Sequence, residues 1–188
     1  LRTLLFVPGN QQRMLEKAAG TGADAVILDL EDAVPQDEKE PARRLVGDFV
    51  PVLSRRESPA VFVRVNSLPS GYLEADLHEV VRQGLKGVCL PKVASSLEVL
   101  ELGFLLDEEE RARGLPPGSL GVIPLIESAR GVIQAHHIAS ASPRVLAIAL
   151  GPRVSPWTWG YKGVLMASSC CTPDPAWSWR PSPPGWPP

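Results

Sequence analysis

Polar and charged residues follow five apolar stretches of this sequence, each at the point where a stretch ends. They include the acids Glu31, Asp32 and Glu127, the guanidinium of Arg64 and the ammonium of Lys92. Groups of these types carry out catalysis when a fold gathers them in one place. Each also has an ordinary structural use, because an acid after a strand often caps the next helix and an arginine often pairs with a nearby acid. The elements that precede these residues therefore decide whether they form a site.

Six short apolar runs alternate with stretches of helical periodicity over residues 1–151. The runs are continuous rather than alternating, a pattern typical of strands that are buried on both faces of a parallel sheet. The intervening stretches place apolar residues on one face, which predicts amphipathic helices. The runs are Thr3–Val7, Ala25–Leu30, Ala60–Val65, Gly87–Leu90, Gly121–Ile126 and Val145–Leu150. The helical positions are Leu73, Leu77 and Val80 in one stretch and Leu97, Leu100 and Phe104 in the next.

This alternation predicts an α/β fold, for which two architectures compete. A doubly wound sheet concentrates its site at one switch point and opens with a glycine-rich turn, whereas a TIM barrel gathers catalytic groups from several strand ends on one face. The first turn, Pro8-Gly9-Asn10, is no phosphate-binding fingerprint, and the polar residues are spread over five strand ends. The sequence therefore favours a TIM (β/α)8 barrel, of which about six strand–helix units are recognisable.

The composition narrows the class of protein. The 188 residues are 44% hydrophobic and 21% charged with a net charge of −2, which argues against a nucleic-acid binder. A membrane span needs a run of about 18 apolar residues, and the sequence has none. No secretory signal is evident at the N-terminus, so we expect a cytoplasmic protein. Cys89, Cys170 and Cys171 form neither a disulfide framework nor metal-ligand spacing, and Cys89 is expected in the core.

Several other polar residues are given structural roles or left open. His78, His136 and His137 fall on predicted helices, away from the strand ends, and are expected at the surface. The acidic run at residues 107–110 is interpreted as a solvated helix end. Asp29 points away from its two leucine neighbours by strand alternation, and this position is compatible both with barrel packing and with the site.

Residues 152–188 differ from the rest of the chain. This segment contains nine of the twenty prolines, four charged residues and all five tryptophans. The proline-rich end, residues 181–188, cannot form a helix or a central strand. We therefore divide the chain into a barrel portion, 1–151, and an aberrant tail, 152–188. A shift of reading frame near Pro152 would explain the composition, because codons for residues 155–160 read one base earlier give Phe-Thr-Leu-Asp-Leu-Gly.

Five strand-end motifs, taken in order, carry a resemblance to a known family. They are Phe6-Val-Pro-Gly-Asn10, Leu28-Asp-Leu-Glu-Asp-Ala-Val34, Val63-Arg-Val-Asn66, Leu90-Pro-Lys-Val93 and Leu125-Ile-Glu-Ser-Ala-Arg130. Over residues 2–151 the sequence resembles the citrate lyase β-subunit group of the HpcH/HpaI aldolase family. The resemblance implies a TIM barrel, dependence on Mg²⁺ and assembly as a trimer or hexamer. It also implies reversible cleavage of a 3-hydroxyacyl thioester, such as citryl-CoA or malyl-CoA, to an acyl thioester and a 2-oxo acid.

The resemblance also implies roles for individual residues. Glu127 matches the first metal ligand of the family, and Arg64 matches the arginine that binds the carboxylate of the 2-oxo acid. Glu31 and Asp32 match an acidic pair that we assign to positioning Arg64 and metal-bound water. Lys92 is expected to add positive potential where the substrate enters. A Mg²⁺ ion held by few carboxylates keeps positions for substrate, which suits this reaction.

One expected ligand is missing from the sequence. The family carries an aspartate as second metal carboxylate after the sixth strand, and Val154 stands there. Two alternatives to the lyase therefore stay open: a non-catalytic truncated remnant or binding subunit, and an aldolase that acts on a free 2-oxo acid. The thioester carrier, free CoA or an acyl-carrier protein, is also left open.

Overall fold

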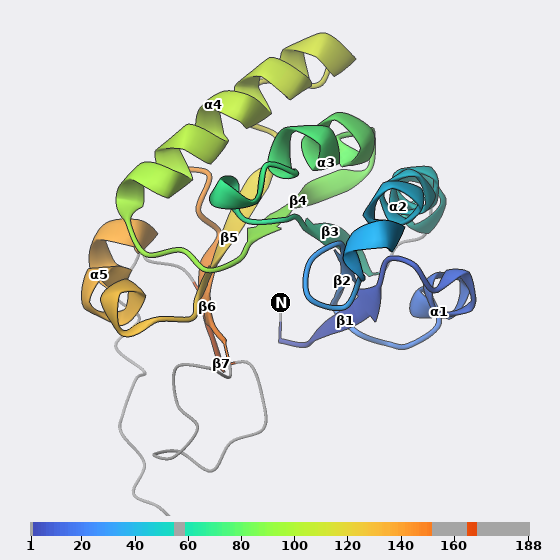
Figure 1. Cartoon of the computed structure of the whole chain (residues 1–188), viewed down its shortest axis with the longest axis horizontal. Coiled ribbons are helices and arrows are strands. Elements are labelled where there is room, and N and C mark those ends of the chain that lie inside the picture. Colours follow the sequence, from blue (N-terminus) through green and yellow to red (C-terminus); the bar gives the residue numbers. More distant parts are fainter. Residues whose placement is uncertain (1, 55–58, 152–164, 169–188) are drawn as a thin grey trace, which may run out of the picture.

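A sheet of parallel strands forms the framework of the computed structural model, which describes residues 2–54 and 59–151 and the backbone of residues 165–168 (Figure 1). The parallel strands are β1 (Leu4–Pro8), β2 (Ala25–Asp29), β3 (Ala60–Arg64), β4 (Leu85–Leu90), β5 (Gly121–Ile126) and β6 (Ala147–Leu150). The helices between them are α1 (Gln12–Ala18), α2 (Lys39–Leu53), α3 (Leu73–Val80), α4 (Ser96–Arg113) and α5 (Ala129–Ala139). Short 3-10 turns, η1 (Gln36–Glu38) and η2 (Leu68–Ser70), precede α2 and α3.

The order of the strands decides between the two architectures. Each strand from β1 to β5 pairs in parallel with the next strand in the sequence. A doubly wound sheet would reverse this order at a switch point, whereas a TIM barrel adds each new strand on the same side. The sheet curls as it proceeds, so the six strands form a half-barrel (Figure 1). The predicted α/β barrel class is confirmed.

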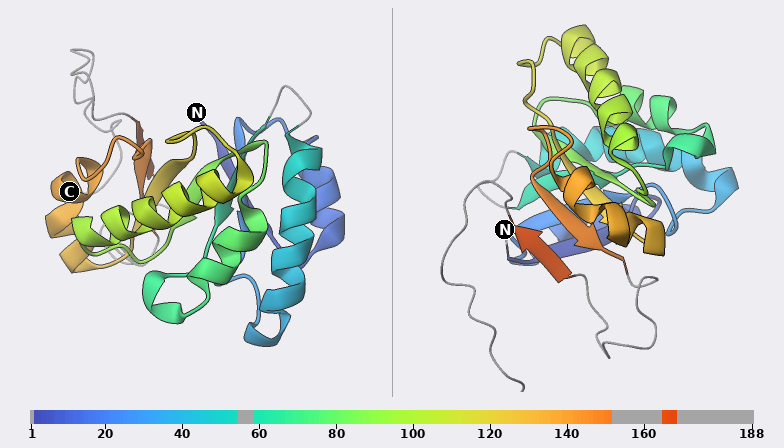
Figure 2. Two further views of the ribbon diagram at one scale, coloured as in Figure 1. Left: turned by 90° about the horizontal axis from the view of Figure 1, so that it is seen from above. Right: turned by 90° about the vertical axis from the view of Figure 1, so that its left-hand side faces the viewer.

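The two faces of the sheet have different partners. Outward-facing residues such as Val26, Val63 and Val88 pack with apolar residues of the helices, which lie on one side of the sheet (Figure 2). The inward-facing residues form a second, smaller apolar cluster. Its buried members are Ala25, Ile27, Phe62, Cys89, Ile123, Leu125 and Ala149. Cys89 is buried as predicted, and this apolar inner layer is the floor beneath the charged strand ends.

A further short strand lies beyond the six apolar runs that predict strands. Strand β7 (Leu165–Ser168) pairs with β6 in antiparallel orientation. It is therefore not the parallel seventh strand that a barrel requires. Val154 and the rest of the tail lie outside the described residues.

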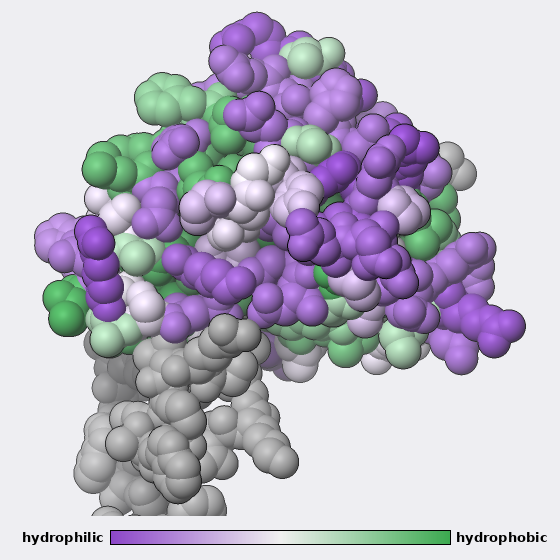
Figure 3. Space-filling model, in the orientation of Figure 1, coloured by the Kyte–Doolittle hydropathy of each residue, from purple (hydrophilic) through white to green (hydrophobic). Residues whose placement is uncertain are grey.

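Helix α4 buries a different face from the one that its apolar pattern predicts. Leu97 and Phe104 are 71% and 70% exposed. Figure 3 shows hydrophobic surface on the side of the molecule where α4 lies. The face against the core is made by Val99, Leu102 and Leu106. The sequence of α4 contains two apolar stripes, and contact with the neighbouring elements selects the second one.

The acidic run on α4 is only partly solvated, contrary to the prediction. Glu110 is 1% exposed, and its carboxylate accepts hydrogen bonds from the guanidinium of Arg144 at 2.7 and 2.9 Å. It also accepts N–H groups of Gly118 and Leu120, each at 2.8 Å. A carboxylate with this many donors can be buried, which a run of acids in a sequence does not reveal.

The remaining surface expectations are met among the described residues. His136 and His137 are exposed on α5, and the ring of His78 is exposed on α3 with Glu109 as its neighbour. None of the described helices combines the length and the apolar character that crossing a bilayer requires.

Candidate active site

Three charged side chains form the layer directly above the apolar inner cluster. Side chains alternate between the two faces of a strand, so Asp29 follows Ile27 and Arg64 follows Phe62 on the inner face. Glu127, one residue beyond β5, occupies the inner face by the same alternation. Asp29 and Arg64 are direct neighbours in the parallel register of β2 and β3. The carboxyl ends of three strands therefore place these groups in one layer, as a barrel site requires.

Arg64 is held by two acids of strand β2 and the loop after it. Its Nε and Nη2 atoms donate to the two carboxylate oxygens of Asp29 at 2.7 and 2.5 Å, and Nη1 lies 3.3 Å from Glu31 Oε2. Its guanidinium carbon is 5.1 Å from the centre of the Phe6 ring. Burial on its own lowers the pKa of Arg64, but the hydrogen bonds and charges of Asp29 and Glu31 raise it above its usual value. Arg64 is therefore a fixed, permanently charged group.

Asp29 is the main partner of Arg64, a role that strand alternation left open. Its carboxylate is buried, and it also accepts the N–H groups of Glu31 at 2.9 Å and Ala33 at 3.3 Å. The same side chain thus orients Arg64 and shapes the loop that carries Glu31 and Asp32. Sequence analysis could not assign it, because the partner that decides its role lies 35 residues away.

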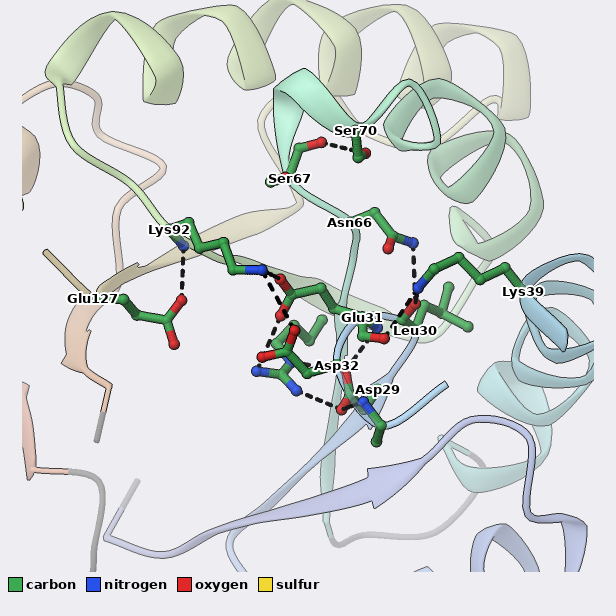
Figure 4. A network of polar contacts seen from close by, with 12 residues as sticks. Asp29, Leu30, Glu31, Asp32, Lys39, Asn66, Ser67, Ser70, Lys92 and Glu127 are labelled. Carbon is green, nitrogen blue, oxygen red and sulfur yellow. Dashed lines mark hydrogen bonds and ion pairs between the residues drawn. The ribbon is translucent and has the colours of Figure 1, made fainter. Parts of the chain in front are cut away.

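Lys92 connects the acidic loop with Glu127 (Figure 4). Its ammonium nitrogen lies 2.5 Å from Glu31 Oε1 and 3.4 Å from Asp32 Oδ1. Its backbone N–H donates to Glu127 Oε2 at 3.2 Å. The hydrogen bond to Glu31 raises the pKa of Lys92, so the ammonium stays charged. Lys92 thus lies beside the predicted site, but its charge is shared with two acids.

Glu127 has the features of a carboxylate prepared for a cation. In the part of the chain that the structure describes, no basic side chain lies within ion-pair distance of it, and its donor is the Lys92 amide. Partial burial, followed by the negative charge of Glu31, raises the pKa of Glu127, against the opposing effect of Arg64. A carboxylate that is short of positive charge gains most from a bound metal ion.

The described residues do not form a complete protein cage for a metal ion. No group of three or more His, Cys, Asp or Glu side chains in the described ranges is placed to hold a metal ion. Mg²⁺ commonly takes only one or two carboxylates and completes its shell with water and substrate. Glu127 therefore fits as one ligand, while position 154, the expected place of a second, lies outside the described residues.

Two adjoining hollows lie next to the charged layer, on the side of the acidic loop and Lys92, and Asp29, Arg64 and Glu127 themselves line neither. The first has a volume of about 320 Å³ and is lined by Glu31, Asp32, Gln36, Lys39, Asn66, Ser67, Ser70, Tyr72 and Lys92. The second, of about 420 Å³, is lined by Ser67, Leu68, Pro69, Pro91, Lys92, Glu98 and Glu101. Ser67 and Lys92 border both. The loops after β2, β3 and β4 therefore border an open cleft beside the Arg64 network.

Two residues that sequence analysis did not assign stabilise these loops. Lys39 donates from its ammonium to the carbonyl oxygens of Leu30 at 2.8 Å and Glu31 at 3.0 Å (Figure 4). Asn66 donates to the same Leu30 oxygen at 3.0 Å and to the buried carboxylate of Asp76 at 2.7 Å. Asn66 is visible in the motif after the third strand, whereas Lys39 stands on a helix and carries no such signal.

A family model described as HpcH/HpaI aldolase/citrate lyase matches residues 2–154. The chain belongs to this family. It is 40% identical over 149 residues to the citrate lyase subunit beta of Leuconostoc mesenteroides subsp. cremoris, covering 79% of this chain and 49% of that protein. It is 36% identical over 154 residues to an L-malyl-CoA/beta-methylmalyl-CoA lyase of Cereibacter sphaeroides, covering 80% and 48%.

A solved structure of a citrate lyase beta subunit is also similar to this chain. The citrate lyase beta subunit from M. tuberculosis, complexed with oxaloacetate and magnesium, superimposes with a TM-score of 0.63 at 30% identity. The match covers 80% of this chain and 57% of that one. The chain spans about half the length of the curated relatives it matches. The family resemblance seen in the five motifs is confirmed, and all five lie within the matched residues.

Proposed function

We propose that this protein is a Mg²⁺-dependent carbon–carbon lyase that cleaves a 3-hydroxyacyl thioester, such as citryl-CoA or malyl-CoA, into an acyl thioester and a 2-oxo acid. The observation that carries the proposal is that the inner face holds both a fixed guanidinium, Arg64, and a carboxylate, Glu127, that has no basic partner among the described side chains. Both lie in the layer above the inner face of the half-barrel. Membership of a family that includes citrate lyase β subunits and malyl-CoA lyases supports it.

In the proposed reaction the bond between C2 and C3 of the thioester breaks. The C3 hydroxyl loses its proton and becomes the carbonyl of the 2-oxo acid, and the bonding electrons pass to C2, which is then protonated. Arg64 would bind the carboxylate of the 2-oxo acid portion, because its planar donors match two carboxylate oxygens. Asp29 and Glu31 would keep the guanidinium from turning away. Mg²⁺, held by Glu127, would stabilise negative charge on the oxygen of the forming carbonyl.

The remaining charged residues would support these two. Glu31 contacts both Arg64 and Lys92, so it would set the distance between them. Asp32, more exposed at the rim of the cleft, would orient water near the metal. Lys92 would balance both acids and limit the negative charge that an anionic substrate meets. The proposal includes the trimer or hexamer that the resemblance implies, to be checked by light scattering on the purified chain.

The decisive experiment is an assay of acyl thioester release from citryl-CoA, malyl-CoA and citramalyl-CoA with and without Mg²⁺. We expect Mg²⁺-dependent turnover of one of these, and a loss of at least about 100-fold in kcat/KM in Arg64→Ala. Arg44→Ala is the matched control, because Arg44 is an exposed arginine of α2 that pairs with Glu40. The kcat/KM of Arg44→Ala should equal that of the unchanged chain.

Other outcomes of this assay would favour the alternatives. A fully active Arg64→Ala variant contradicts the assignment of Arg64. Cleavage of a free 2-oxo acid without CoA would instead indicate an aldolase. Saturable binding of oxaloacetate that depends on Arg64, without turnover of any thioester, would indicate a binding subunit.

The proposed reading-frame shift near Pro152 bears on the second metal ligand. An in-frame gene that codes for Val154 would leave Glu127 without the expected carboxylate partner. Sequencing of the gene across codons 150–160, together with the intact mass of the protein, tests this. A clean frame with the matching mass rules the shift out.

A further inference from the structure

Lys92 has an unusual backbone conformation. Its φ of 58° lies in the left-handed region, and among the described residues it is the one non-glycine with a positive φ. L-amino acids with a side chain seldom adopt this conformation, and the residues that do so most readily are glycine, asparagine and aspartate. A lysine here is held by its surroundings, and such outliers gather at functional sites.

The left-handed turn directs two parts of Lys92 to two different sides of the site (Figure 4). The backbone N–H points to Glu127 Oε2 beyond strand β5, and the side chain runs to Glu31 and Asp32 beyond strand β2. The next residue, Val93, donates its N–H to the carbonyl oxygen of Leu125 at 3.0 Å, which ties the turn to β5. One residue thus bridges the acidic loop and Glu127.

We propose that Lys92 is a positioning residue whose backbone and side chain have separable tasks. The left-handed backbone presents its N–H to Oε2 and so orients the Glu127 carboxylate toward a divalent cation. The ammonium holds Glu31, which in turn holds Arg64, so it supports the binding of the 2-oxo acid. A glycine would adopt the turn with less strain but would lose the second task. This inference rests on the proposed function and adds a division of labour that the proposed reaction does not itself require.

Two variants separate the tasks. Lys92→Gly removes the ammonium and keeps the left-handed turn, whereas Lys92→Val removes the ammonium and disfavours the turn, because branched residues resist positive φ. Mg²⁺ binding is measured by calorimetry, and oxaloacetate binding by the same method. We expect Lys92→Gly to retain Mg²⁺ affinity within about threefold and to lose about tenfold in oxaloacetate affinity. Lys92→Val should in addition lose about tenfold or more in Mg²⁺ affinity.

Controls separate these effects from loss of folding. Lys86→Met removes an exposed lysine of the same strand, β4, and should change neither affinity. If the circular dichroism spectrum of Lys92→Val differs from that of the unchanged chain, Lys92→Ala replaces it. Alanine also disfavours a positive φ, but less strongly than valine. Equal Mg²⁺ affinity in the glycine variant and the valine or alanine variant overturns the backbone task. Unchanged oxaloacetate affinity in Lys92→Gly overturns the side-chain task.

A metal-free readout keeps this inference distinct from the proposed function. The amide resonance of residue 92 in a ¹⁵N–¹H spectrum reports the hydrogen bond to Glu127. Adding Glu127→Gln should shift this resonance when residue 92 is lysine or glycine. In Lys92→Val, adding Glu127→Gln should leave the resonance unchanged. If the chain shows this pattern but binds no Mg²⁺, the result contradicts the proposed lyase activity. The proposal that the Lys92 backbone orients Glu127 is then still supported. If Glu127→Gln leaves the residue-92 amide resonance of the unchanged chain in place, the proposal that this amide orients Glu127 is wrong.

Discussion

At the scale of single residues, Glu127 is confined from two sides. Its Oε2 atom accepts the Lys92 amide, and its other oxygen faces Gly151 at the end of β6. A Cβ atom at Gly151 would lie 2.6 Å from Glu127 Cγ and 2.7 Å from Oε1, closer than real Cβ contacts. Gly151 is itself anchored, because its N–H donates to the carbonyl oxygen of Ile126 at 2.8 Å. The position of the carboxylate therefore depends on the absence of a side chain at residue 151.

Gly151→Ala therefore tests whether the position of the Glu127 carboxylate matters, because it leaves the carboxylate itself unchanged. We expect the added methyl group to push the carboxylate aside and to weaken Mg²⁺ binding by about tenfold or more, measured by calorimetry. The matched control is Gly103→Ala on α4, where nothing lies within 4 Å of the new Cβ. That control should leave Mg²⁺ binding unchanged and raise the free energy of unfolding by up to about 1 kcal/mol. Unaltered Mg²⁺ affinity in Gly151→Ala would mean that the carboxylate is not placed by this contact.

At the scale of elements, the sequence predicts those features of the fold that depend on the local pattern of apolar and polar residues. The six apolar runs locate the six parallel strands within about two residues, and the polar residues after them are found at one end of the half-barrel. Contacts between distant segments were not predictable. The role of Asp29 depends on Arg64, and the buried face of α4 depends on its neighbours rather than on its two apolar stripes. The left-handed conformation of Lys92 has no sequence signal, because lysine is not a turn-forming residue.

The same limit applies to Glu110, which joins three elements at the ends of the strands opposite the site. Its partners precede β5 and β6, and Arg144 also contacts Asp107. Burial on its own raises the pKa of Glu110, but hydrogen bonds from Arg144 and from the N–H groups of Leu120 and Gly118 lower it to about 2. The charged carboxylate is thus stabilised by folding.

This lowered pKa predicts acid sensitivity of the fold. A carboxyl group whose folded-state pKa lies below its usual 4.5 contributes its full stabilisation above pH 4.5 and loses it as the pH falls toward 2. Glu110→Gln should lower the free energy of unfolding by about 3 kcal/mol at pH 7 and flatten its decline over this range. Urea unfolding at several pH values measures both. Glu108→Gln, an exposed acid of the same helix, should change neither, and a Glu110→Gln curve parallel to that of the unchanged chain would contradict the assignment.

At the scale of the whole molecule, the half-barrel has strands of two kinds. Strands β2 to β5 pair on both sides, whereas β1 pairs only with β2 among the described strands. Amides of a strand that is paired on one side open at lower cost than those of a central strand. The stability of the sheet should therefore fall from its centre toward β1, even though the inner apolar cluster includes Phe6 as a neighbour.

Hydrogen–deuterium exchange followed by mass spectrometry measures this gradient directly on the full chain. Peptides that cover β1 should exchange at least about tenfold faster than peptides that cover β3, because β3 has β2 and β4 as partners and its Phe62 is buried. The difference should persist when the protein is diluted. Equal protection of β1 and β3 would mean that the outer edge of β1 is paired in solution. Loss of that protection on dilution would assign the pairing to a second copy of the chain, because an intermolecular pairing depends on concentration and an internal one does not.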